Sequence, residues 1–146
     1  MYTHILISTD GSELAQKGVA HGLSLAKALG SKVLIVTATE PFPIIYGREW
    51  QPTPQLAKQF EDESANAAAA ILAQVKDDAD KIDVPVETAH LVNRVAADAI
   101  LDAAEKGDCN LIVMSSHGRS GLSKMLLGSQ AGKVVAKSLV PVLIVR

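Results

Sequence analysis

The chain has 146 residues, of which 48% are apolar and 21% are charged, and its formal net charge is −2. This length and balance exclude a disordered chain and predict one folded domain over residues 1–146. The small net charge gives no electrostatic reason to expect a nucleic acid or an anionic membrane as partner. Cys109 is the single cysteine, which excludes an internal disulfide. With no apolar stretch of the roughly 20 residues that a membrane span needs, we expect a cytoplasmic protein.

Short apolar runs alternate with helical patterns along the chain. The runs cover residues 5–7, 33–36, 84–92, 111–114 and 142–145. All except the third are continuous, which is typical of parallel strands buried on both faces. The third run alternates and contains Pro85, which cannot donate to a neighbouring strand and so predicts an edge. We therefore predict a doubly wound α/β fold, with a five-stranded parallel sheet in the order 3-2-1-4-5 and helices on both faces.

Between these runs, small and apolar residues recur at helical spacing. The first helix is predicted to follow the N-cap Ser12 and to end at Gly30. The third is predicted to stop at Gly107 and the fourth before Pro141. The four inward faces are predicted to contain Ala15, Val19, Gly22, Ala26 and Leu29; Leu56, Phe60, Ala67, Ile71 and Val75; Ala97, Ile100, Leu101 and Ala104; and Ala131, Val134 and Val135.

Residues 40–54 interrupt this alternation with four prolines, Tyr46 and Trp50. A long connection inside a compact domain is typical of a functional segment or a mobile one. Two interpretations follow: a lid near a ligand, or a mobile loop that faces a partner.

Polar and glycine-rich segments follow the first and fourth runs, at residues 8–12 and 115–121. In an open parallel sheet, ligands bind where the carboxyl ends of strands meet and the winding direction reverses. Gly128 and Ser129 open the last helix, whose N-terminus favours an anion. Arg119 adds a permanent positive charge. Taken singly, these residues could be turn glycines and a helix cap; together they indicate a phosphate site.

Standard phosphate motifs are absent from this region. Residues 128–133 resemble a Walker loop, but three residues instead of four separate the glycines, and Val134 replaces the required hydroxyl residue. No Gly-x-Gly-x-x-Gly follows the first run, which disfavours a dinucleotide site.

Four features together resemble the universal stress protein family. They are Asp10 after the first strand, the Ser-Ser-His-Gly-Arg-Ser-Gly-Leu run at 115–122, Leu-Gly-Ser at 127–129, and the ending at 141–145. ATP-binding members of that family share a glycine, two residues, a second glycine, nine residues, and a glycine followed by serine or threonine. Gly118 stands at the second position here, and Ser115 replaces the first glycine. Either the phosphate contact shifts or the turn tolerates this small side chain, and we expect the second.

The resemblance implies an adenine nucleotide, ATP above all, with Mg²⁺ or Mn²⁺ held mainly by the phosphates. It also implies a homodimer through the C-terminal strand Val142–Val145 and a role in stress response. The residues that it places beside adenine and ribose are Ser8, Thr9 and Asp10, with Ala38 and Met114 nearby, and those around the phosphates are Ser115, Gly118, Arg119, Gly128, Ser129 and Gln130.

His117 is the candidate base for a hydrolase, although a hydrogen bond that braces the glycine turn is the alternative. His4, His21 and His90 show no metal-ligand spacing. We therefore expect binding with at most slow ATP hydrolysis. Two other readings stay open: a nucleotide-independent interaction module in which Ser115 marks a decayed site, and a nucleotide-using enzyme.

Overall fold

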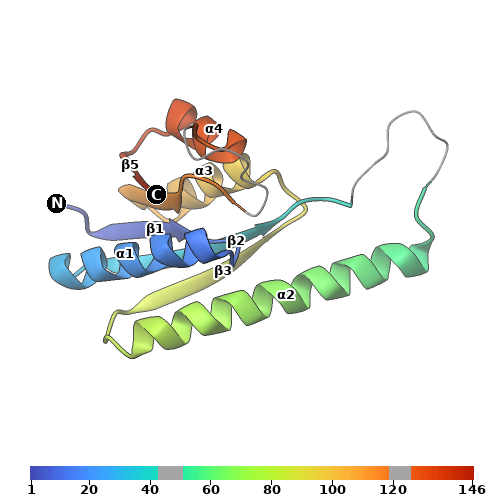
Figure 1. Cartoon of the computed structure of the whole chain (residues 1–146), viewed down its shortest axis with the longest axis horizontal. Coiled ribbons are helices and arrows are strands. Elements are labelled where there is room, and N and C mark those ends of the chain that lie inside the picture. Colours follow the sequence, from blue (N-terminus) through green and yellow to red (C-terminus); the bar gives the residue numbers. More distant parts are fainter. Residues whose placement is uncertain (43–50, 119–125) are drawn as a thin grey trace.

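A computed structural model describes residues 1–42, 51–118 and 126–146. Strands and helices alternate along the chain, as Figure 1 shows: β1 (His4–Ser8), α1 (Glu13–Leu29), β2 (Lys32–Thr39), α2 (Pro54–Asp80), β3 (Val86–Val92), α3 (Ala96–Lys106), β4 (Leu111–Ser115), α4 (Ser129–Lys137) and β5 (Val142–Val145). The five strands are parallel and lie in the order β3-β2-β1-β4-β5. The predicted fold class and strand order are confirmed.

The sheet is buried on both faces, which explains the continuous apolar runs. Ile5 and Ile7 of β1 pack in one cluster with residues of α1 and α2, whereas Leu6 packs in a second cluster with residues of α3 and α4. All three side chains are fully buried. Because alternate residues of a strand point to opposite faces, a central strand covered by two helix layers needs apolar side chains at every position.

Both ends of α1 have the caps that the sequence predicts. The Ser12 hydroxyl accepts a hydrogen bond from the N–H of Ala15 at 3.2 Å, and α1 ends at Gly30 with φ of 67°. That left-handed conformation strains any residue with a Cβ. The second helix begins after Thr53, whose hydroxyl accepts from Leu56 N–H. Gly107 follows the third helix as predicted.

The predicted inward faces are wrong at individual positions. Ala67 is exposed, and its neighbour Ala68 is the buried residue. Residues 67–70 are all alanine, so their pattern could not show which of them faces the sheet. Leu29, Leu56 and Val135 are also exposed: Leu29 is the last residue of α1, Leu56 lies in the first turn of α2, and Val135 follows the fully buried Val134 and so lies off the inward face of α4.

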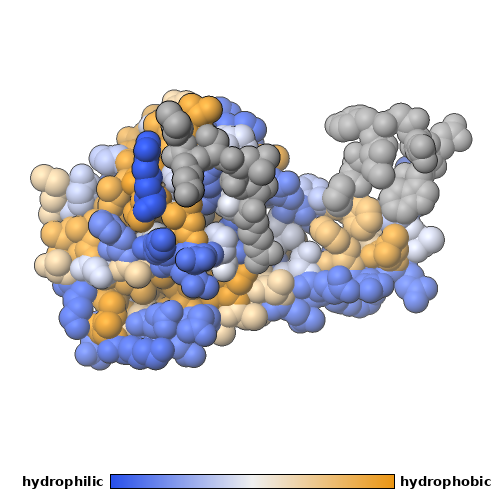
Figure 2. Space-filling model, in the orientation of Figure 1, coloured by the Kyte–Doolittle hydropathy of each residue, from blue (hydrophilic) through white to orange (hydrophobic). Residues whose placement is uncertain are grey.

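The second helix extends past the sheet at its N-terminal end, as Figure 1 shows, and its buried residues all lie in its later turns. Phe42 packs against Phe60 of this projecting part, with ring centroids 5.0 Å apart. Figure 2 shows hydrophilic residues along the outer side of α2. Residues 43–50 lie outside the described chain, so the two interpretations of the proline-rich connection stay predictions. Among the described residues, no helix has the length and apolar character of a membrane span.

Candidate functional site

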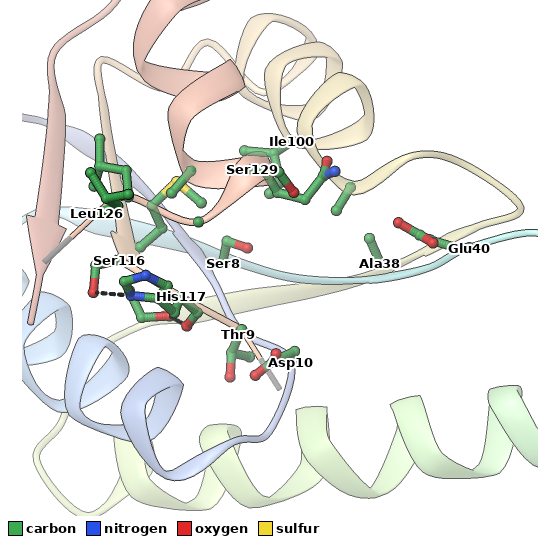
Figure 3. Close-up of a pocket in the computed structure, with 18 residues that line it drawn as sticks. Ser8, Thr9, Asp10, Ala38, Glu40, Ile100, Ser116, His117, Leu126 and Ser129 are labelled. Atoms are coloured by element: carbon green, nitrogen blue, oxygen red, sulfur yellow. Dashed lines mark hydrogen bonds between the residues drawn. The ribbon is translucent and has the colours of Figure 1, made fainter. Parts of the chain in front are cut away.

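A cavity of about 690 Å³ opens at the carboxyl edge of the sheet, between the ends of β1 and β4. The chain leaves β1 toward α1 on one face and leaves β4 toward α4 on the other, so this is the point where the winding direction reverses. Its size is in the range of small-molecule sites. The cavity is shown in Figure 3, and the sequence-predicted residues that line it are Ser8, Thr9, Asp10, Ala38, Met114, Ser115, Gly118, Gly128, Ser129 and Gln130.

Of the sequence-predicted site residues, Arg119 lies outside the described residues. The other ten come from four separate parts of the chain, and the sheet topology brings them to one edge.

The loop after β1 is held by its own hydrogen bonds. Thr9 is buried, its N–H donates to the carbonyl of Val36 at 3.0 Å, and its hydroxyl accepts from the N–H of Gly11 at 3.2 Å. One carboxylate oxygen of Asp10 accepts from the N–H of Ser12 at 2.9 Å. This Asx-type turn fixes the direction of the Asp10 side chain at the cavity wall.

Ser115 and Ser116 organise the loop after β4. The Ser115 hydroxyl is buried and donates to the carbonyl of His117 at 2.8 Å, so the side chain that replaces glycine closes the turn. The N–H of Ser116 donates to Val145 at 2.9 Å, and its carbonyl accepts from the N–H of Gly128 at 2.8 Å. One peptide segment therefore joins β4 to β5 and to the start of α4.

Gly118 and Gly128 stand where two loops approach each other closely. A Cβ at Gly118 would lie 2.7 Å from Oδ2 of Asp10, and a Cβ at Gly128 would lie 3.0 Å from the carbonyl oxygen of Ser116. Since ordinary contacts are longer, a side chain at Gly118 would displace the Asp10 carboxylate, and one at Gly128 would force the Ser116 carbonyl to shift slightly. The N–H of Gly128 is already bonded to Ser116, so the donors available to a ligand begin one residue later.

The first turn of α4 offers these donors. The N–H groups of Ser129, Gln130 and Ala131 donate to no described residue, and Gly128 supplies no side-chain cap. The first N–H groups of a helix have no partner within it, and the helix dipole adds partial positive charge there. The cavity wall formed by α4 can therefore bind an anion.

The charged side chains on the described part of the wall are acidic. Asp10 and Glu40 line the cavity, and the described lining residues include no lysine or arginine. No group of three or more histidine, cysteine or carboxylate residues in the described ranges could hold a metal ion. The N–H groups of the wall favour a bound anion, whereas the carboxylates of Asp10 and Glu40 repel it.

His117 and Cys109 have different environments. Nδ1 of His117 is 3.1 Å from the Ser116 hydroxyl, an intra-loop hydrogen bond drawn in Figure 3.

Cys109 is buried in the core beneath α3, and burial raises the pKa of its thiol to about 11. A thiol with this pKa is almost wholly protonated at neutral pH and is a poor nucleophile.

Sequence reasoning missed part of the wall. Four of the lining residues that it missed are apolar and carry no chemical signal in the sequence: Ala96 and Ile100 on α3, and Leu126 and Leu127 before α4. Glu40 follows β2 as Asp10 follows β1. Its position after a predicted strand was the signal in the sequence that could have identified it. The remaining lining residues that were not predicted as binding residues are Ser116, His117 and Ala131.

Comparison with known proteins identifies the family. The model of the universal stress protein family matches residues 1–146. A Thermus aquaticus protein described as "Universal stress protein in QAH/OAS sulfhydrylase 3'region" is 35% identical over 146 residues, which is 100% of both chains.

Two solved structures are also similar. The MJ0577 protein of Methanocaldococcus jannaschii superposes with a TM-score of 0.81 at 26% identity, over 99% of this chain and 96% of its own. A universal stress protein in complex with cAMP has a TM-score of 0.73 at 28% identity, over 99% of this chain and 97% of its own. Sequence and fold agree along the whole length, and the chain belongs to the universal stress protein family.

Proposed function

We propose that this chain binds ATP or a related adenine nucleotide in the carboxyl-edge cavity and acts as a regulatory binding protein in the stress response. The observation that carries the proposal is the open first turn of α4, which faces a cavity at the point where the winding reverses. The relative that was solved with cAMP supports an adenine nucleotide as the ligand class.

The wall chemistry suggests one orientation of the nucleotide. The phosphates lie at the N–H groups of Ser129, Gln130 and Ala131, with Gly118 close by. The ribose hydroxyls lie beside Asp10, whose carboxylate accepts hydrogen bonds. The base lies toward Ala38 and Ile100, where Glu40 would repel a phosphate.

A divalent cation fits this arrangement as part of the ligand. A triphosphate beside Asp10 brings like charges together, and Mg²⁺ or Mn²⁺ held mainly by the phosphates would reduce that repulsion. Arg119 would add a second positive charge to the phosphates.

Binding without dedicated turnover is the activity that we propose. Phosphoryl transfer needs a positioned base and a held metal ion in addition to phosphate contacts. His117 is bonded to Ser116 within its own loop, and Asp10 is held by the N–H of Ser12. Both side chains therefore serve the loop geometry, and ATP hydrolysis is at most slow. We place the protein in the cytoplasm.

We also propose a homodimer through β5. This strand pairs with β4 on one side and forms the edge of the described sheet. Its residues are half buried and apolar, and Leu139 beside it is 96% exposed. Val135 and Leu126 expose further apolar surface, and Figure 2 shows hydrophobic surface around α4 and β5. An uncovered apolar edge is a template for pairing with a second chain.

Mass spectrometry of the small molecule released when the purified protein is denatured tests the nucleotide directly. Equilibrium dialysis with ATP, ADP, AMP and cAMP then ranks the ligands. The proposal expects an adenine nucleotide in both experiments. A dimer that binds none of the four at millimolar concentration would contradict it and would favour a nucleotide-independent interaction module.

A further inference from the structure

The third helix has no side-chain cap from its own sequence. Val95 occupies the N-cap position and cannot accept a hydrogen bond through its side chain. Instead, the N–H of Ala97 donates to the side-chain oxygen Oε1 of Gln130, on α4, at 2.9 Å. Ala97 is fully buried, so without Gln130 this N–H would lose its partner in the interior. Gln130 therefore caps the neighbouring helix.

This bond determines which way the Gln130 amide faces. An N–H group needs an acceptor, so the oxygen must point at Ala97, and the amide nitrogen Nε2 points away from it. Nε2 donates to no described residue, and no buried polar side-chain atom in the described chain lacks a partner, so Nε2 is accessible. Gln130 lines the cavity. Its Nε2 is therefore an oriented, accessible donor on a residue of the cavity wall.

The surroundings of this side-chain donor suit a flat base better than a phosphate, in contrast to the expectation from the resemblance, and only the backbone N–H of Gln130 belongs to the phosphate donors at the start of α4. Ala96 and Ile100 form an apolar wall on α3, and Ala38 lies across from them at the end of β2. Figure 3 shows Ala38 and Glu40 at one end of the cavity, with Ser116, His117 and Leu126 at the other. The carboxylate of Glu40 disfavours a phosphate at the Ala38 end, whereas apolar walls favour the faces of a nucleobase.

We propose that Gln130 determines base specificity, with its Nε2 donating a hydrogen bond to a ring nitrogen of the bound purine. This inference rests on the proposed function. Unprotonated purine nitrogens are acceptors, and a donor already fixed by Ala97 loses little side-chain freedom when it binds one. One amide would then hold α3 through its oxygen and read the base through its nitrogen.

Two variants separate these roles of Gln130. Gln130→Glu retains an oxygen acceptor for the N–H of Ala97 but removes the donor, while Gln130→Met keeps the chain length and removes both. We expect Gln130→Glu to unfold at the temperature of the wild-type protein and Gln130→Met to unfold at a lower temperature. Equal midpoints for the Met variant and the wild type would contradict the cap.

The base contact is tested with AMP and its 1-deaza, 3-deaza and 7-deaza analogues, in which one ring nitrogen becomes C–H at constant charge. Isothermal titration calorimetry on the wild-type protein should show roughly three- to tenfold weaker binding for one analogue, the range of a single hydrogen bond. Gln130→Met should bind that same analogue and AMP with equal affinity.

If every analogue loses as much affinity in the Met variant as in the wild-type protein, Gln130 reads no ring nitrogen and the inference is wrong. A wild-type protein that binds none of these four compounds, and none of ATP, ADP and cAMP either, overturns the proposed function, and the inference with it. The two failures are therefore distinguishable.

Discussion

Gly118→Ala tests whether the two loops must meet as closely as the structure shows. The added methyl group would lie 2.7 Å from Oδ2 of Asp10. Gly118 does not have positive φ, so alanine imposes no backbone strain, and the contact itself decides the result. The other carboxylate oxygen of Asp10 is bonded to Ser12, so the short side chain cannot turn away without weakening that bond.

The expected cost follows from this hydrogen bond. Weakening the Asp10–Ser12 bond costs about 1 kcal/mol, the typical net value for an intramolecular hydrogen bond. For a domain of this size, 1 kcal/mol lowers the unfolding midpoint by about 2–4 °C. Under the proposed function, displacement of Asp10 also weakens ATP binding, by about tenfold if the loss is about 1.4 kcal/mol.

Gly132→Ala is the matched control, because a Cβ there meets nothing within 4 Å and the residue lies inside α4. Alanine is the better helix former, so this variant should gain up to about 1 kcal/mol. Differential scanning calorimetry and ATP titration on both variants give the comparison. A Gly118→Ala protein with the wild-type midpoint and the wild-type ATP affinity would refute the close approach and its role in the site.

Three further changes have defined outcomes. Leu139→Asp places a charge on a residue that is 96% exposed, so the fold should persist while light scattering shifts from dimer to monomer; an unchanged dimer would rule out this surface. Gly30→Ala forces alanine to φ of 67° and should cost about 1 kcal/mol in urea unfolding, and a neutral result would contradict the left-handed cap. Burial raises the pKa of Cys109 from 9.0 to about 11, so the unfolded chain releases this proton first. The free energy of unfolding should therefore fall as pH rises from about 9 to 11, and Cys109→Ala should lose less over the same interval.

The sheet could be predicted from the sequence because its physical cause is local. A continuous apolar run such as 111–114 requires cover on both faces, and Pro85 places its strand at an edge. The residues of α2 that face the sheet were harder to predict, since consecutive alanines give no periodicity that separates Ala67 from Ala68.

The site was predicted where its chemistry is local and missed where it depends on packing. Asp10 lies two residues after β1 and Gly128 lies directly before α4, so their positions at the sheet edge follow from the topology. The bond between Gln130 and Ala97 joins residues that are 33 positions apart, and it exists because α3 and α4 pack together on one face. No local pattern in the sequence carries that information.

The central claim is that phosphates bind at the start of α4. A change of charge at residue 128 tests it most directly. Gly128→Asn and Gly128→Asp have the same shape, add the same Cβ near Ser116, and both provide good N-caps, so they differ in one negative charge. ATP affinity measured by isothermal titration calorimetry should be at least about tenfold weaker for the Asp variant than for the Asn variant, since a carboxylate within a few ångströms repels a phosphate strongly. Equal ATP affinity for the two variants would contradict the phosphate site.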